Sequence, residues 1–464
     1  MSNNFFAGFS RADITPEGKM QLVGQFHTRV ADHANDPLTA NVMAMGTPTE
    51  PVIWISLDLL QIPGFVTEQI ASAIAEVVPG FERSRLIVSC IHNHTGPHLT
   101  STPGDWGESY RVVNAPDETT PEDYRDKELV PKLAQAAKEA VADMKPAATS
   151  SVLGHAVVGH CRRVKYRDGS ELMYGTSLDY NFDRLEASPD NGIEWLFVYD
   201  ESGKELRGLV MNVSCPAQIL ENKYYYTADY AGYFRRALWD KLGYEIPVLT
   251  VIGCAGNISP RDLVRRGRGE ASMHNIEGAE EIAARLLCCF EYVRPKAEKC
   301  INFEPEFAHS FMMAPLGLRT VSREQIAWAH SRYDPVLAKY DGDASKFTQQ
   351  ERQGLYREAG ILAREKQQAR CTQYDAPIHA FRIGDTAVVT NPFELYIEYG
   401  LRMIARSKFD HTMTAQLTDD IAGYLPTPEA VDGGHYSTYV ASCTVSCEGG
   451  ETLTETSIRM MNGL

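Results

Sequence analysis

Short runs of apolar residues alternate along the chain with stretches whose apolar positions recur every three or four residues. The apolar runs predict buried strands at residues 52–57, 86–88, 208–213, 248–252 and 386–389. The helical periodicity predicts helices at about residues 67–78, 127–144, 231–241 and 278–287. Strands and helices that alternate in this way indicate an α/β fold, with mixed β-sheets flanked by helices.

Residues 322–368 differ from the rest because they are rich in Glu, Gln, Arg, Lys and Ala and poor in strand formers. This composition predicts a helical hairpin inserted into the α/β body. The 464 residues contain no internal repeat and no low-complexity or linker segment. We therefore expect residues 1–464 to form a single domain, in which the insertion is a surface buttress or, alternatively, a lid.

The charge balance argues against two classes of partner. The chain has 45 Lys and Arg against 61 Asp and Glu, and its net charge of −16 disfavours nucleic acid and anionic membrane surfaces. No segment has the length and apolarity of a transmembrane span, and residues 1–6 do not resemble the start of a signal peptide. We therefore expect a cytoplasmic protein with a small-molecule substrate, and homo-oligomerisation stays open.

The densest group of candidate catalytic side chains follows the strand at residues 86–88. His92 and His94 stand two residues apart, just before a Gly-Pro turn. If strand geometry continues through them, both imidazoles project from the same face, because side chains alternate along a strand. Two neighbouring imidazoles suit either a metal site or an acid–base pair.

Polar side chains also follow later strands, where open α/β folds gather their ligands. Cys215 is a candidate thiolate ligand or nucleophile, with a small buried thiol as the alternative. Ser259 precedes Pro260 and stands three residues before Asp262, which is the pattern of a helix N-cap. Ser259 can cap a helix and also take part in a site, since the two roles do not exclude each other.

Three more residues complete the candidate set. Glu394 is expected in the first turn of a helix that runs to about Arg406, where the helix dipole favours a negative charge. Tyr424, in a loop bounded by Gly and Pro, is a candidate acid, hydrogen-bond donor or metal ligand, with simple packing as the alternative. Arg162 and its neighbour Arg163 are candidate clamps for a carbonyl or carboxylate group, or ordinary surface arginines.

Taken in order, several motifs resemble the catalytic domain of the neutral ceramidase superfamily. They are residues 7–16, the His-Asn-His-Thr-Gly-Pro run at 92–97, Asn-Pro-Phe-Glu at 391–394, and Gly-Tyr-x-x-Thr-Pro-Glu at 423–429. The resemblance covers nearly the whole chain. It implies the fold of that catalytic domain and a zinc ion held by the matching positions His92, Glu394 and Tyr424.

The resemblance also implies roles for three residues around the metal. His94 matches the second histidine of the family motif, which forms hydrogen bonds or acts as an acid or base. Arg162 matches an arginine near the substrate. Ser259 matches the serine of a Gly-Asp-x-Ser-Pro loop, in which Asn257 replaces the aspartate here.

The chain departs from the family at the second zinc-binding histidine. Where the family has Asn-x-x-Cys-His-Pro, residues 212–216 read Asn-Val-Ser-Cys-Pro, so that histidine is missing. Cys215 stands one residue before the vacant place and is our predicted replacement, as a soft ligand. Gln218 and Asp229 are the alternatives.

Three functions follow from these interpretations. The first is a zinc-dependent hydrolase that cleaves an amide bond of a small soluble substrate with a metal-activated water. There His94 moves the proton, and Arg162 and Ser259 orient the substrate. The second is a metal-free cysteine hydrolase with Cys215 as nucleophile and His94 as base. The third is a protein that keeps the fold and binds a small molecule without catalysis. We favour them in this order.

Overall fold

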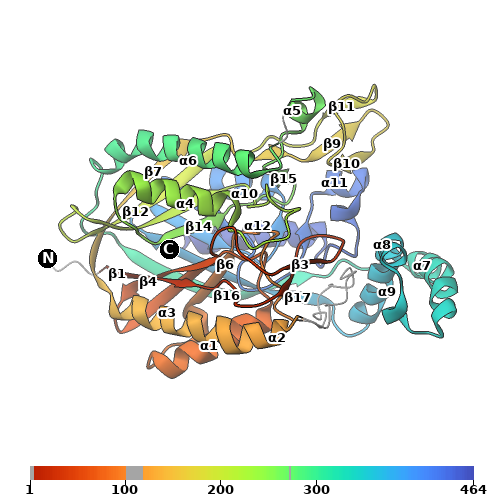
Figure 1. The fold of residues 1–464 in the computed structure, drawn as a ribbon, viewed down its shortest axis with the longest axis horizontal. Coiled ribbons are helices and arrows are strands. Elements are labelled where there is room, and N and C mark those ends of the chain that lie inside the picture. The colour runs from red at the N-terminus through yellow and green to blue at the C-terminus, as the bar shows by residue number, and fades with distance from the viewer. Residues whose placement is uncertain (1–4, 101–118, 271–272) are drawn as a thin grey trace.

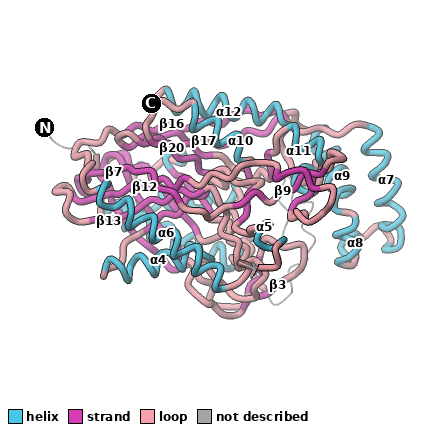
Figure 2. The backbone as a smooth tube through the Cα atoms, turned by 90° about the horizontal axis from the view of Figure 1, so that it is seen from above, coloured by secondary structure: helices cyan, strands magenta, loops and turns pink. Residues whose placement is uncertain are grey.

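Two β-sheets lie face to face at the centre of the protein, and helices cover their outer faces (Figures 1 and 2). The computed structural model describes residues 5–100, 119–270 and 273–464, so residues 1–4 of the segment compared above with a signal peptide lie outside the described residues. The two sheets and the two helical layers form the mixed α/β fold that the alternating pattern predicts.

The larger sheet has eight strands in the order β14-β13-β12-β7-β1-β4-β5-β6. Both edges of this sheet are parallel pairs, β5 with β6 and β13 with β14. The strands are β1 (Phe6–Asp13), β4 (Thr39–Thr47), β5 (Glu50–Leu57), β6 (Leu86–Cys90), β7 (Lys145–His155), β12 (Gly192–Asp200), β13 (Leu206–Val213) and β14 (Val248–Ile252).

The smaller sheet has four strands, ordered β16-β17-β18-β20, and its last two strands are also parallel. These strands are β16 (Phe307–Gly317), β17 (Gln373–Ile383), β18 (Thr386–Thr390) and β20 (His411–Ala415). All five predicted strand segments therefore lie in the two central sheets.

Strand β5 shows why the predicted strands read as unbroken apolar runs. Ile53 and Ile55 pack into the core beneath the helices, whereas Val52 and Trp54 face the core between the two sheets. There the ring of Trp54 meets Phe381 of the smaller sheet edge to face, with 5.2 Å between ring centroids. Because both faces are buried, every position of the run is apolar except Ser56, whose hydroxyl donates to the Thr250 carbonyl.

Helices complete the two outer layers. Helices α1 and α3 pack over one half of the larger sheet and α4 and α6 over the other, while α10 and α12 cover the smaller sheet (Figures 1 and 2). They are α1 (Gly64–Val77), α3 (Val130–Ala142), α4 (Asp229–Leu242), α6 (Ile276–Ala297), α10 (Ile397–Ala405) and α12 (Cys447–Asn462). Within the described ranges, none of the helices has both the length and the apolar character needed to cross a bilayer.

The helices predicted between residues 322 and 368 are present at one end of the molecule (Figure 1). They are α7 (Arg323–Leu337), α8 (Gln349–Gly354) and α9 (Tyr356–Gln368). Ser322 begins α7 with a capping box, in which its side chain accepts a hydrogen bond from the Gln325 backbone N–H and the Gln325 side chain bonds back.

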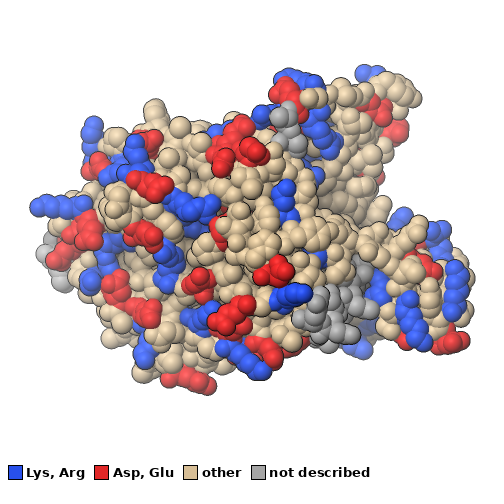
Figure 3. All heavy atoms as spheres, in the orientation of Figure 1, with Lys and Arg blue, Asp and Glu red and all other residues tan. Residues whose placement is uncertain are grey.

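Figure 3 shows a hollow between this helical segment and a second projecting lobe. The lobe carries α5 (Leu263–Gly267) and the strands β9 (Arg163–Tyr166), β10 (Glu171–Met173) and β11 (Phe182–Leu185). On the face shown, basic and acidic side chains are interspersed rather than gathered into a single patch.

Two local predictions are wrong. Glu394 does not open a helix, because Glu394–Leu395 form the short strand β19, which pairs with β21 (Tyr424–Leu425), and α10 begins only at Ile397. Ser259 does not cap α5, because Ile258–Ser259 form β15, which pairs with β8 (His160–Cys161). Asp262 is the cap, and its carboxylate accepts from the backbone N–H groups of Val264 and Arg265.

Candidate active site

A cavity of about 340 Å³ lies where several strands of the two sheets end. Its walls include residues from the loops that follow β6, β13, β14, β18 and β20, which are all members of parallel pairs. The strands of a parallel pair end at the same edge of a sheet, so residues far apart in sequence meet there. The volume suits a small molecule, since ligand pockets span about 300–1,000 Å³.

His92 and His94 both line this cavity, but the reason differs from the predicted one. Strand β6 ends at Cys90, and His92 adopts a left-handed backbone with φ of 60°. The two rings therefore do not share a strand face. The turn itself brings them together, edge to face, with 5.0 Å between their centroids.

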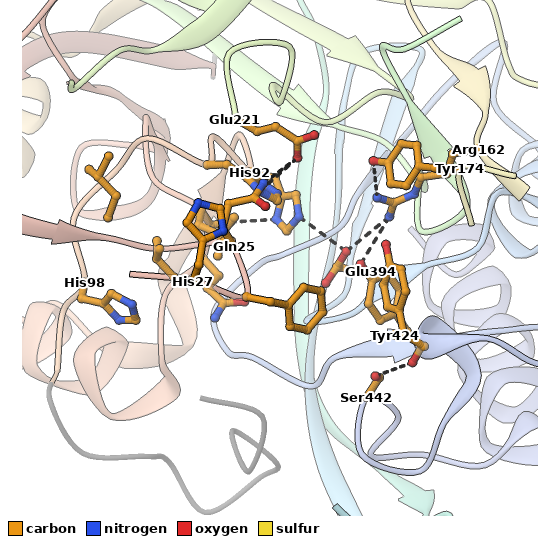
Figure 4. A pocket seen from close by; sticks show the side chains of 18 of the residues that line it. Gln25, His27, His92, His98, Arg162, Tyr174, Glu221, Glu394, Tyr424 and Ser442 are labelled. Carbon is orange, nitrogen blue, oxygen red and sulfur yellow. Dashed lines mark hydrogen bonds and ion pairs between the residues drawn. The ribbon is translucent and has the colours of Figure 1, made fainter. Parts of the chain in front are cut away.

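The geometry around His92 leaves one ring nitrogen available. Its Nδ1 lies 3.1 Å from the Leu60 carbonyl oxygen, which only accepts, so Nδ1 carries the hydrogen. Burial lowers the pKa of His92, although the charge of Glu394 opposes this effect. The neutral ring thus directs an Nε2 lone pair at the Glu394 carboxylate, 3.5 Å away (Figure 4).

Glu394 and Tyr424 face the cavity side by side, because β19 and β21 place them in register. Arg162 Nη2 lies 3.7 Å from the Glu394 carboxylate and 3.4 Å from the Tyr424 hydroxyl (Figure 4). Burial, with the charge and hydrogen bond of Glu394, raises the pKa of the Tyr424 phenol well above its usual value. A nitrogen, a carboxylate and a phenol therefore converge from three distant segments.

These three groups fit a zinc ion. Zinc takes nitrogen and oxygen ligands, and its catalytic sites commonly use three protein ligands and leave a fourth position open. A lone pair of His92 Nε2 faces the oxygens of Glu394, an arrangement that a cation between them stabilises. Among the described residues, no three His, Cys, Asp or Glu side chains converge on a metal position, so a metal held here would need the Tyr424 phenol as its third protein ligand.

His94 is held by a second carboxylate. Its Nδ1 lies 3.4 Å from Glu221. Gln25 donates to the same carboxylate over 3.1 Å, and Figure 4 labels both of these residues. Burial is the main reason that the pKa of His94 falls well below its usual value. Its Nε2 is buried and has no hydrogen-bond partner among the described residues, so this nitrogen is available to a bound molecule.

Arg162 is fixed between two aromatic rings. Its guanidinium carbon lies 5.8 Å from the ring centroids of both Tyr174 and Tyr424. Its Nη2 donates to the Gly256 carbonyl over 2.7 Å. The side chain is 3% exposed and lines the cavity, so its charge is held in a set orientation toward a ligand.

Cys215 and Ser259 lie outside the cavity lining, although both are described and fully buried. Cys215 Sγ is 3.6 Å from the Pro216 carbonyl oxygen, and burial raises the pKa of the thiol well above its usual value. Ser259 Oγ accepts from the Arg261 backbone N–H and lies 3.5 Å from the Tyr174 hydroxyl. The structure thus brings together five of the seven predicted site residues: His92, His94, Arg162, Glu394 and Tyr424.

Most of the cavity wall was not among the predicted residues, and four of the missed side chains lie close to the predicted ones: Tyr174, Glu221, Arg261 and Tyr436. Glu221 forms an ion pair with Arg261 and sets the position of His94. Glu221 follows the apolar pair Ile219-Leu220 in a loop, where no motif distinguishes it from a surface glutamate. The only available signal was its place after β13, one of the strands whose ends form the site.

The whole chain is similar to solved ceramidases. It matches a neutral ceramidase from Pseudomonas aeruginosa with a TM-score of 0.69 and 15% identity, over 100% of this chain and 75% of that one. A structure described as a ceramidase complexed with C2 gives a TM-score of 0.68 and 15% identity over the same shares. No protein-family model and no curated protein matches the sequence. The neutral ceramidase-like fold predicted from the ordered motifs is therefore confirmed.

Proposed function

We propose that this protein is a metal-dependent hydrolase that cleaves an amide bond of a small substrate. The observation that carries the proposal is the convergence of His92 Nε2, the Glu394 carboxylate and the Tyr424 phenol on one small cavity. Zinc is the ion that suits these nitrogen and oxygen ligands, and when bound it supplies Lewis acidity and an acidified water. The similarity in fold to ceramidases supports an amide as the bond that is cleaved.

Each remaining group has a defined task in this reaction. Glu221 accepts the Nδ1 hydrogen of His94 and so leaves the His94 Nε2 lone pair free. Nε2 takes a proton from the attacking water and then delivers it to the leaving nitrogen. Arg162, held between its two tyrosines, orients the substrate carbonyl and stabilises negative charge that develops on its oxygen.

The site argues for small substrates over long lipids, and ceramide itself is not part of the proposal. The cavity of about 340 Å³ is near the lower end of the range for ligand pockets. Much of its lining is polar or ionisable, including two arginines, two glutamates and four histidines: Arg162, Arg261, Glu221, Glu394, His27, His92, His94 and His98.

Metal content and hydrolysis, measured on the same preparations, test the proposal. We expect about one zinc per chain in the wild type and release of ammonia or amine from simple amides. His92→Ala should lose both the zinc and the hydrolysis. His330→Ala is the matched control, because His330 is an exposed histidine on α7, and this variant should keep both.

Equal zinc in the wild type and in His92→Ala would refute the metal site. If zinc is lost in His92→Ala but the wild type hydrolyses no amide, the proposed reaction is refuted and the proposed metal site is supported. Absence of both, with small molecules still bound in the cavity, would favour the non-catalytic binding function.

A further inference from the structure

One side of the cavity is built from three aromatic residues, Phe26, Tyr356 and Tyr436, which we call the aromatic wall. Phe26 meets Tyr356 edge to face, with 5.9 Å between centroids and 75° between planes. It meets Tyr436 in the same way, at 5.8 Å and 77°. Both distances and angles are those of favourable aromatic pairs.

The aromatic wall is continuous with the proposed metal site. Tyr436 also contacts Tyr424 edge to face, with 6.1 Å between centroids. A row of four rings thus runs from the proposed metal ligand Tyr424 through Tyr436 and Phe26 to Tyr356. These rings therefore share one cavity with Glu394, Tyr424 and the proposed metal position.

The aromatic wall is held in place by the helical segment at residues 323–368. Gln353 in α8 donates its side-chain N–H to the Phe26 carbonyl over 2.6 Å. Tyr356, at the start of α9, forms a hydrogen bond with the Ser442 hydroxyl. The bond from Gln353 fixes the backbone at Phe26, and the helical segment contributes the Tyr356 ring to the cavity.

Although its backbone is fixed, Phe26 is 39% exposed, unlike the phenylalanines in the core. An exposed aromatic side chain in a pocket gains free energy when a ligand covers it, by about 25 cal/mol per Å² of apolar surface. The exposed part of the Phe26 ring can be covered by a further ring, because aromatic pairs form in both offset-stacked and edge-to-face arrangements.

We propose that the aromatic wall recognises an aromatic group carried by the amide substrate. The statement that the aromatic molecule is a substrate rests on the proposed function, whereas the statement that the aromatic wall binds an aromatic amide does not. A flat ring fits a small cavity whose wall presents both ring faces and ring edges. The helices at residues 323–368 then contribute to substrate specificity.

Binding of four simple amides to the full-length protein, measured by calorimetry, tests the inference without any need for turnover. The probes are benzamide, acetanilide, cyclohexanecarboxamide and acetamide. We expect one of the two aromatic probes, benzamide or acetanilide, to bind at least about tenfold tighter than cyclohexanecarboxamide and acetamide. Tighter binding of benzamide would place the ring on the acyl side of the amide, and tighter binding of acetanilide would place it on the amine side. Equal binding of benzamide, acetanilide and cyclohexanecarboxamide, or no measurable binding of any probe, would overturn the inference.

Variants of the aromatic wall locate the effect. Phe26→Ala should weaken binding of the preferred aromatic amide about tenfold, and Phe26→Leu should remove most of its preference over cyclohexanecarboxamide. Tyr356→Phe keeps the ring and should bind like the wild type. Tyr292→Ala is the matched control, because Tyr292 is an 85% exposed tyrosine on α6, and this variant should change nothing. Unchanged selectivity in Phe26→Ala would also overturn the inference.

Hydrolysis of the same probes separates the inference from the proposed function. Selective binding of an aromatic amide that is never hydrolysed would leave the aromatic wall standing and refute the hydrolase. Hydrolysis of acetamide and of the aromatic amides with the same kcat/KM, together with equal affinities, would support the hydrolase and refute the role of the wall.

Discussion

Two histidine–carboxylate pairs in this molecule are built from similar groups and have opposite surroundings. His92 faces Glu394 at 3.5 Å on the wall of the cavity. His379 bonds to Asp419 at 2.8 Å in the core, where both side chains are fully buried. The first pair lies open to a ligand, and the second is enclosed by protein.

The neighbours of each pair explain the difference. Asp419 also accepts from the backbone N–H of Val88, and His379 Nδ1 lies 2.9 Å from His309 Nε2. The core pair therefore uses its hydrogen-bonding capacity within the fold and links β6 of the larger sheet to β17 of the smaller one. In the cavity pair, a neutral imidazole nitrogen and a carboxylate point at each other without a hydrogen between them. Unused hydrogen-bonding capacity, rather than residue type, therefore distinguishes the pair at the cavity from the pair in the core.

The same isosteric change in each pair separates function from stability, and the cavity pair gives the larger expected effect. Glu394→Gln should lower kcat/KM for amide hydrolysis by about 10³-fold or more, or roughly 4 kcal/mol, because an amide is a poor ligand for the proposed metal. The free energy of unfolding should change by less than about 1 kcal/mol. Steady-state kinetics measures the change in kcat/KM, and urea unfolding measures the change in the free energy of unfolding. A large loss of stability would make Glu394 a structural residue.

In the core pair, Asp419→Asn should destabilise the protein by about 3–5 kcal/mol, because it leaves His379 and the Val88 N–H with a poorer buried partner. Urea unfolding measures the change. Asp334→Asn is the control, since Asp334 pairs with His330 on the exposed surface of α7 and should cost less than about 1 kcal/mol. Similar losses in the two variants would mean that enclosure does not strengthen the core pair.

Glu221 offers a way to test whether a carboxylate acts through a neighbouring histidine. Glu221→Gln should lower kcat about 10- to 100-fold with little change in KM, because His94 loses the partner that orients it. The pH profile of kcat should shift with the variant. A change confined to KM, with an unchanged profile, would assign Glu221 to substrate binding through Arg261 instead.

A third pair, His411 with Glu194 at 2.8 Å, joins β20 to β12 and provides a pH test. Burial opposes the charged form, but the hydrogen bond and charge of Glu194 outweigh it and raise the pKa of His411 above 6.5. A raised folded-state pKa stabilises the fold fully below pH 6.5, and this stability is lost as the pH rises through the folded value.

The wild type should therefore lose about 1 kcal/mol between pH 6 and pH 8 relative to Glu194→Gln. Unfolding in urea across that range measures this difference. Parallel stability curves for the two proteins would show that the pair makes no pH-dependent contribution.

The smallest expected effect concerns the cysteine hydrolase alternative. Iodoacetamide should label the exposed Cys288 and Cys300 and leave Cys215 unlabelled, because burial keeps Cys215 protonated and out of contact with solvent. Amide hydrolysis should persist after this treatment. Loss of activity in proportion to labelling of Cys215 would instead restore the cysteine mechanism.

The fold was largely predictable because its pattern is repeated in every buried strand. The run at residues 52–57 is apolar on both faces apart from Ser56, since one face packs beneath the helices and the other between the two sheets, and β5 forms at that place. Glu394 was misplaced because the pattern after β18 also fits a helix start. Its actual strand depends on pairing with Tyr424, a partner that local sequence cannot reveal.

The site was predictable where a motif exists and unpredictable where only three-dimensional neighbours define a role. The residues 92–97 and 423–429 carry recognisable patterns, and His92, His94 and Tyr424 do line one cavity. Glu221 and Phe26 lie in loops without a pattern, and they reach the cavity only through the fold. Local sequence likewise gave no sign that His92 adopts a left-handed turn.

The walls of the cavity draw on positions from Gln21 to Ser442, which lie at opposite ends of the chain. If the chain is cut anywhere in this interval, each of the two fragments therefore carries only part of the cavity lining. Each recombinant fragment on its own should fail to bind a ligand. Two complementary pieces expressed together can recover ligand binding only by reassembling the cavity, so this chain is a candidate for a split reporter.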